Sequence, residues 1–211
     1  MHGRLITDNV LVTFETMHYI NGRKGDKKGE MALKLDMSKV YDRVEWLCLE
    51  KIMAKLGFGE KWRKLIMKCV TSVSYSVKIN GKPRGKIIPS RGIRQGDTLS
   101  SYLFLLCAEG LSTLIKKSVD MGEMEGVTVC KGAPRPSHLF FVDDNIIFCK
   151  ATIEECNAIQ RILGVYEQAL GQQLNRTKTA LFFSKNTPGH PWWGKIRGTL
   201  SMILMTNLAK S

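Results

Sequence analysis

Three aspartates are the residues whose type and position could do chemistry. Asp36 ends an alternating apolar segment, and Asp143 and Asp144 lie where two short apolar segments meet. Carboxylates that converge from separate elements can hold two divalent cations, the arrangement that phosphoryl transfer from a nucleoside triphosphate needs. The alternative is structural, because an aspartate after a strand is often a turn or capping residue and Asp-Asp-Asn is a common hairpin tip. Spacing alone favours the structural alternative.

A mixed α+β fold would position these aspartates. Residues 31–36 alternate as a strand does, and residues 139–142 and 146–149 predict a hairpin with the Asp143–Asp144 pair at its tip. If the two strands that carry the aspartates are neighbours, the carboxylates meet at one end of the sheet. The other predicted elements are helices over 7–20, 44–56, 60–73, 99–119 and 152–170, a hairpin around 80–81, and a strand over 180–184.

The charge balance predicts a polyanionic partner. The chain has 32 Lys+Arg against 19 Asp+Glu, a formal net charge of +13, and residues 21–29 form a predicted exposed basic loop. Such a surplus attracts phosphates without sequence preference, so nucleic acid is the leading candidate. Because the charges are spread along the chain, a merely soluble basic protein is the alternative.

The cysteines and the apolar runs indicate an intracellular protein. The six cysteines form no CxxC pair, and several stand in apolar contexts, as Cys107 does, so they are predicted to be reduced core residues. No uninterrupted apolar run of about 18 residues occurs, and the N-terminus lacks an apolar signal region. No membrane contact is therefore expected.

Five segments follow one another in an order that a lone Asp-Asp pair does not have. They are residues 3–9, residues 32–44 around Asp36, residues 91–104, residues 141–144 with the Asp143–Asp144 pair, and residues 171–179. In this order they resemble the block ahead of the palm and motifs A, B, C and D of reverse transcriptases of non-LTR (LINE-type) retrotransposons, particularly those of plants. The resemblance covers roughly residues 3–188 and is specific because the whole ordered set is present.

This resemblance implies an α+β right-hand polymerase palm, in which helices pack on a ferredoxin-like sheet, with partial fingers and without a thumb. Residues 1–30 would be the fingers segment, residues 31–185 the palm, and residues 186–211 a divergent tail. The implied partners are an RNA template, a DNA primer and dNTPs, while the oligomeric state is left open. The family's habit implies an intracellular location in the nucleus, the cytoplasm or both.

The resemblance also assigns catalytic roles. Asp36 and Asp143, with Asp144 beside them, would hold two Mg²⁺ ions, with Mn²⁺ as an alternative, and oxygen ligands suit such hard cations. Lys178 matches the lysine of motif D, which could donate a proton to the departing pyrophosphate. The alternative is that Lys178 is a surface lysine without a catalytic role.

Motif A implies further contacts to the nucleotide. Main-chain groups of Met37 and Ser38 would lie near the triphosphate, because exposed amides form anion sites. Tyr41, five residues after Asp36, matches the aromatic residue that crowds a ribose 2′-hydroxyl and so favours deoxynucleotides. Core packing is the alternative role for Tyr41.

Motif B supplies the remaining substrate contacts. Gln95 and Gly96 match positions that contact the incoming nucleotide and the template, where glycine permits close approach of the backbone. Arg94 would contact phosphates through its guanidinium group. The alternatives are that Gly96 only permits a turn and that Arg94 is a solvated loop arginine.

The sequence departs from the family pattern at several positions. Val40 and Val142 stand where alanine is usual, and Thr98 and Ser101 replace prolines, which is expected to loosen the motif B loop. These changes keep a second hypothesis open, a catalytically inactive retrotransposon fragment that only binds RNA or DNA. A third, an unrelated α+β protein, requires the ordered segments to be a coincidence.

Overall fold

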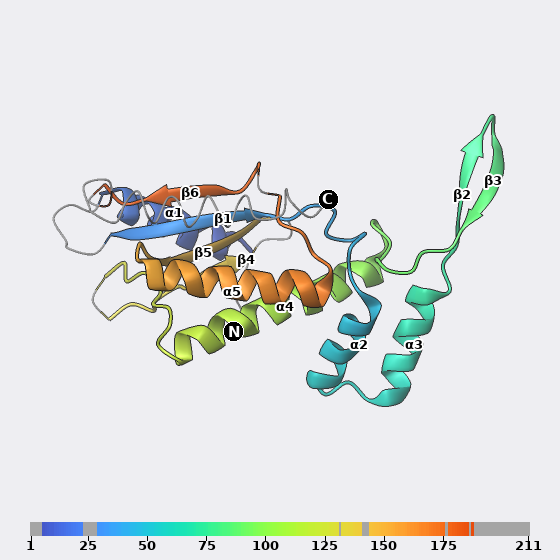
Figure 1. The fold of residues 1–211 in the computed structure, drawn as a ribbon, viewed down its shortest axis with the longest axis horizontal. Helices are drawn as coiled ribbons and strands as arrows, with labels where there is room; N and C mark the ends of the chain where they lie inside the picture. The colour runs from blue at the N-terminus through green and yellow to red at the C-terminus, as the bar shows by residue number, and fades with distance from the viewer. Residues whose placement is uncertain are drawn as a thin grey trace. The chain divides into compact units, whose positions relative to one another are not determined.

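The computed structural model describes residues 6–22, 29–130, 132–140, 144–175, 177–185 and 187. The chain forms two compact units, and Figure 1 labels their helices and strands. The first unit comprises Met1–Ser38, Leu111–Val165 and Leu174–Ser211, and the second comprises Lys39–Gly110 and Tyr166–Gln173. The predicted boundaries after residues 30 and 185 stay a prediction.

An antiparallel sheet is the centre of the first unit. Its order is β4 (His138–Phe140), β5 (Asp144–Lys150), β1 (Glu30–Asp36) and β6 (Ala180–Phe183). Strand β1 is buried on both faces over most of its length, which explains its apolar centre, Met31-Ala32-Leu33. The predicted strands around Asp36 and after Asp143 are thus confirmed, and they are neighbours.

Helix α1 (Ile6–Gly22) covers part of this sheet. Its Ile20 belongs to a buried cluster with Ala32 of β1, Leu139 of β4 and Phe148 of β5. Burial of side chains of this size stabilises the fold by about 1.5–3 kcal/mol each. The cluster fixes the central strands in their order.

Two long helices contribute residues to both units. These are α4 (Thr98–Asp120) and α5 (Ile153–Leu170), and in the first unit Leu111, Ile115 and Ile159 are fully or almost fully buried. By length and composition alone, α4 is the one helix among the described residues that is apolar enough to cross a membrane. Core helices pass the same test, so this is weak evidence.

Helix α5 begins with half of a capping box. The hydroxyl of Thr152 accepts the amide N–H of Glu155 at 3.3 Å. The carboxylate of Glu155 does not return to Thr152, because its Oε2 accepts the N–H groups of Lys150, at 3.0 Å, and Glu125, at 3.3 Å. Burial raises the pKa of the Glu155 carboxyl above its ordinary value of 4.5, against the opposing effect of these hydrogen bonds.

Replacing Glu155 tests this arrangement. We expect Glu155→Ala to lower the free energy of unfolding by about 2 kcal/mol, since two backbone N–H groups lose their acceptor. Glu155→Gln keeps an acceptor and should cost less. Because the folded-state pKa is raised, the carboxyl stabilises the fold fully below pH 4.5 and loses this contribution as the pH rises through the folded-state pKa.

Urea unfolding of the wild type and Glu155→Gln, run from below pH 4.5 to neutral pH, checks the sign. The stability advantage of the wild type should shrink as the pH rises. An advantage that grows with pH would contradict the direction of the pKa shift.

The second unit consists of helices and one hairpin. Helices α2 (Trp46–Lys55) and α3 (Glu60–Thr71) pack together, with the apolar side chains of Leu49, Met53 and Ile66 buried. Gly57 has φ 85°, as expected of the residue that stops α2.

The hairpin predicted around Asn80-Gly81 is confirmed. Strands β2 (Tyr75–Ile79) and β3 (Lys82–Ile87) are paired antiparallel. Asn80 and Gly81 both have positive φ, 49° and 81°, the requirement of a tight type I′ turn.

The prediction that the cysteines are core residues holds for only part of the set. All six are free, and Cys107, Cys149 and Cys156 are buried, so that burial raises the pKa of Cys107 and Cys156 to about 12. Cys69 and Cys130 are exposed, and for them the prediction is wrong. Cys69 is exposed although its neighbour Val70 is buried, and local sequence context did not distinguish the two positions.

Candidate active site

The register of the sheet places two of the three aspartates opposite each other. Asp36, the last residue of β1, pairs with Asp144, the first residue of β5. Residues directly opposite in an antiparallel pair have Cα atoms about 4.5–5.5 Å apart. Asp143 and Val142 lie outside the described residues, as does the side chain of Asp144. The role of the aspartates as metal ligands stays a prediction.

A turn over Asn175, Lys178 and Thr179 is bonded to the main chain of Asp36. The carbonyl of Asp36 accepts the N–H of Asn175 at 2.8 Å, and the N–H of Asp36 lies 3.5 Å from the Thr179 hydroxyl. The carbonyl of Asn175 in turn accepts the N–H groups of Lys178, at 3.2 Å, and Thr179, at 2.9 Å. Lys178 belongs to the same turn as the two residues that contact Asp36, and its N–H is hydrogen-bonded there. Its side chain is exposed to solvent.

The chain turns immediately after Asp36. Met37 forms an isolated antiparallel bridge with Leu174, and a run of turn residues begins at Ser38. Met37 and Ser38 are both half-buried. The predicted triphosphate contacts therefore lie in the turn that continues β1.

In the second unit, backbone hydrogen bonds join the turn around Tyr41 to the loop over residues 91–97. The N–H of Ile93 donates to the carbonyl of Tyr41, and the N–H of Gly92 donates to that of Val44, both at 2.8 Å. The indole N–H of Trp46 donates to the carbonyl of Gly92 at 2.7 Å. The segments that resemble motifs A and B are thus bonded together in this unit.

The close approach at Gly92 requires a glycine. Its φ is 89°, and a Cβ at this position would lie 2.8 Å from the carbonyl oxygen of Asp42. Real Cβ atoms essentially never come so close to an oxygen, and a positive φ adds strain for any other residue.

The ring of Tyr41 is supported from one side. It stacks on Phe104 of α4 with the ring centroids 5.2 Å apart and the planes inclined by 29°. Phe104 is buried and Tyr41 is half-buried. Tyr41 therefore packs on the core, which is the alternative role that the sequence left open. Because the side chain is only half-buried, the predicted role in excluding a 2′-hydroxyl stays compatible with the structure.

Arg94, Gln95 and Gly96 are exposed at the tip of the loop. Gly96 has φ 86°, and no atom lies within 4 Å of a Cβ built there. Glycine is needed at this position for its conformation, and the space beside it is open to a ligand.

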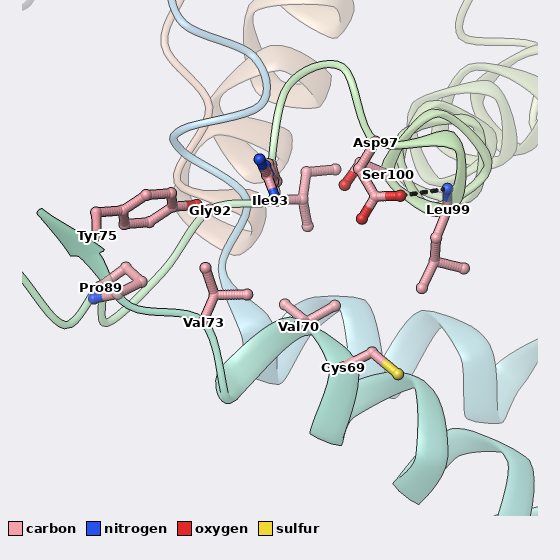
Figure 2. A pocket seen from close by; sticks show the side chains of 11 residues that line it. Cys69, Val70, Val73, Tyr75, Pro89, Gly92, Ile93, Asp97, Leu99 and Ser100 are labelled. Atoms are coloured by element: carbon pink, nitrogen blue, oxygen red, sulfur yellow. Dashed lines mark hydrogen bonds between the residues drawn. The ribbon is translucent and has the colours of Figure 1, made fainter.

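The loop is held although its prolines are replaced. Asp97 caps α4, since its Oδ1 accepts the N–H of Leu99 at 3.1 Å, a bond that Figure 2 shows as a dashed line. Thr98 is the first residue of α4. Together with the bonds at Gly92 and Ile93, this cap holds the loop at both ends, and the loosening expected from the replaced prolines stays a prediction.

A small cavity lies beneath the loop (Figure 2). Val70, Val73, Tyr75 and Ile93 are among the residues that line it, and its volume of ≈ 20 Å³ holds about one water molecule. It is too small for a nucleotide.

Two supporting residues were not identified from the sequence. Trp46 reaches Gly92, and the buried Gln172 donates from Nε2 to the carbonyl of Val40 at 2.9 Å. Gln172 lies in the segment that resembles motif D, and its position just after the helix-ending Gly171 gave no sign that its side chain is buried.

Within the described residues, no group of three or more His, Cys, Asp and Glu side chains gathers in a way that could hold a metal ion. Asp143 and the Asp144 side chain are outside this set. The donors available at this end of the sheet, carboxylates carried by neighbouring strands, suit a hard divalent cation.

Comparison with known proteins identifies the class. Residues 3–195 match the reverse transcriptase (RNA-dependent DNA polymerase) family, and the chain belongs to this family. A polyprotein from the type-1 retrotransposable element R2 of Popillia japonica is 26% identical over 172 residues, which is 82% of this chain and 27% of that protein. The 149 kDa protein of transposon TX1 of Xenopus laevis is 27% identical over 178 residues, 84% of this chain and 13% of that protein.

A third relative is shorter and more similar. An uncharacterised mitochondrial protein of Arabidopsis thaliana is 52% identical over 66 residues, which is 31% of this chain and 54% of that protein. The chain thus spans little more than half of this relative and about an eighth to a quarter of the two transposon proteins. The predicted resemblance to retrotransposon reverse transcriptases is confirmed.

Solved structures show the same fold. The apo telomerase of Candida tropicalis, truncated from its C-terminal domain, has a TM-score of 0.60 at 18% identity, over 85% of this chain and 35% of that one. The telomerase of Candida albicans in complex with a fragment of telomeric RNA has a TM-score of 0.60 at 15% identity, over 85% and 30%. The predicted α+β polymerase fold is confirmed.

Proposed function

We propose that this chain is a reverse transcriptase domain that adds dNTPs to the 3′ end of a DNA primer on an RNA template. One observation carries the proposal: in a chain of this family, Asp36 and Asp144 are paired in the register of two neighbouring strands. Like charges directly opposite in a sheet are unfavourable, so a bound cation is the natural reason to keep both.

Asp36 and Asp143, with Asp144 beside them, would hold two Mg²⁺ ions, or Mn²⁺ in their place. Bound divalent ions would activate the primer 3′-hydroxyl and neutralise the charge of the departing pyrophosphate. Asp36 ends β1, where its carbonyl accepts the N–H of Asn175 and its N–H donates to the Thr179 hydroxyl, so that the turn holds its main chain. The protein's part would be to present the three carboxylates at this end of the sheet.

Other residues bind and orient the nucleotide. Backbone amides at Met37 and Ser38 would donate to the triphosphate, and the exposed Lys178 would give a proton to the leaving pyrophosphate. Gln95 and Gly96 would contact the base pair being formed, and Arg94 would contact a phosphate. The open space beside Gly96 supports this assignment.

Tyr41 would select deoxynucleotides, because its ring crowds a 2′-hydroxyl. We expect Tyr41→Val to raise the use of rNTPs relative to dNTPs at least about tenfold, since one extra group in a tight pocket is worth roughly 1–3 kcal/mol. Tyr41→Phe keeps the ring on Phe104 and should retain the selectivity. Single-nucleotide primer extension with each nucleotide type measures the ratio, and an unchanged ratio in Tyr41→Val would contradict the gate.

A nucleic-acid-binding fragment without polymerase activity is the second candidate. The charge of +13 and the replacement of the motif B prolines by Thr98 and Ser101 favour it, whereas the bonds and the cap that hold the loop favour the polymerase.

Asp143→Asn distinguishes the two candidates. A polymerase should lose primer extension in this variant and keep its affinity for RNA. A wild type that binds RNA but extends no primer would establish the second candidate.

A further inference from the structure

The β2–β3 hairpin is exposed over its whole length. Every residue of both strands is exposed, including Val77 at 53% and Ile79 at 54%. An isolated two-stranded hairpin is marginally stable in water. A ribbon of this kind, kept with apolar side chains in solvent, indicates a surface that is completed by a partner.

The charge of the hairpin indicates what that partner is. Lys78, Lys82, Arg84 and Lys86 are exposed, and no acidic residue occurs between Tyr75 and Ile88. Within the described part of the chain, none of these four cations has an ion pair. Elsewhere in the same unit cations do pair with carboxylates, as Lys64 does with Glu60 and Arg91 with Glu45.

The pairing of the strands combines cations and apolar groups. Lys82 pairs with Ile79, and Arg84 pairs with Val77. Directly paired residues lie on the same face of a sheet, so this face of the ribbon carries two cations on β3, each opposite a β-branched side chain on β2. Cations can bind phosphates, while the branched side chains can contact sugars.

The base of the hairpin is anchored beside the loop over residues 91–97. Tyr75 at the start of β2 and Pro89 just after β3 line the cavity that Ile93 and Asp97 also line (Figure 2). The chain runs from β3 directly into this loop. A nucleic acid strand that reaches the loop would pass the base of the hairpin.

We propose that the β2–β3 hairpin is a phosphate-binding arm that contacts the backbone of the primer–template beside the motif B loop. The choice of nucleic acid as occupant rests on the proposed function and on the unbroken positive charge of the ribbon. A phosphate backbone would use all four cations without needing a matched set of carboxylates, and a protein partner is an outcome of the test.

The test is the salt dependence of binding. The full chain is titrated into a fluorescently labelled DNA primer annealed to an RNA template, between about 50 and 200 mM salt, and the anisotropy is followed. We expect the variant K78Q/K82Q/R84Q/K86Q to flatten the slope of log K against log salt by about 2.8–3.6, since it removes four phosphate contacts and each lost contact removes about 0.7–0.9. Over this range the affinity of the wild type would then fall roughly 50- to 150-fold more than that of the variant.

A matched control removes four other exposed cations of the same unit. K51Q/K55Q/K61Q/K68Q changes the charge of α2 and α3 by the same amount, and its slope should change by less than about 1. Because all substituted side chains are exposed, circular dichroism should show unchanged folding. The double variant K82Q/R84Q, expected to give about half the full effect, repeats the test with less disturbance.

The proposal is overturned if the hairpin variant keeps the wild-type slope, or if the two quadruple variants lower it equally. The first result would assign the exposed apolar side chains to a protein partner. Since binding is measured without catalysis, a flattened slope supports the arm even if the wild type extends no primer. Primer extension with an unchanged slope would refute the arm and leave the proposed function standing.

Discussion

Asp36→Asn should reduce primer extension by at least about three orders of magnitude, which corresponds to about 4 kcal/mol of lost transition-state stabilisation. Asparagine keeps the size of the side chain but not its charge, and a neutral amide is a poor ligand for Mg²⁺. The hydrogen bonds of Asp36 to Asn175 and Thr179 use its main chain. The fold should therefore be retained, and the loss should lie in catalysis.

Asp120→Asn is the matched control. Asp120 is exposed at the C-terminal end of α4, so the same chemical change there should leave the extension rate and the melting temperature almost unchanged. Single-turnover extension on an RNA template, with thermal unfolding of each variant, compares the two. Extension by Asp36→Asn at the wild-type rate would remove Asp36 from the proposed site.

Gly92→Ala should lower the free energy of unfolding by about 3 kcal/mol. Its left-handed conformation costs a non-glycine residue about 1–3 kcal/mol, and the new Cβ would meet the Asp42 carbonyl at 2.8 Å. To relieve that contact the loop must move, which weakens the hydrogen bonds from Gly92 to Val44 and from Trp46 to Gly92. Because these bonds join the segments resembling motifs A and B, primer extension should fall as well.

Gly96→Ala distinguishes the cost of a positive φ from the cost of the steric contact at the new Cβ. Gly96 has a similar φ, 86°, but no atom lies near its Cβ position, so we expect a loss of only about 1 kcal/mol. Urea unfolding of both variants gives the comparison. Equal losses would show that the contact with Asp42 does not constrain the loop.

The elements with strong local signals were predicted from the sequence. The alternation before Asp36 and the Asn80-Gly81 turn each depend on interactions within a few residues, and the structure confirms them. The order of the strands is different, since β5 pairs with β1 across more than a hundred residues. Spacing permitted this neighbourhood, and the family resemblance, not local pattern, gave reason to expect it.

The contacts that support the site were not predictable in the same way. Gln172 is hydrogen-bonded to Val40, and Thr179 to Asp36, although each pair is far apart in the sequence. The periodicity of a local segment carries no information about such contacts. The exposure of Cys69 and of the β2–β3 hairpin is equally a property of packing. The Val-Lys-Ile alternation of the hairpin does not tell whether one face is buried, and the structure leaves both faces in solvent.

The most direct test of the central claim is the product made by the purified wild-type chain from an RNA template, a DNA primer, the four dNTPs and Mg²⁺. We expect a primer extended with the complement of the template, no product without template or with a chelator, and none from Asp143→Asn. Salt-sensitive binding of the RNA without any extension would contradict it and would leave a polymerase fold that only binds nucleic acid.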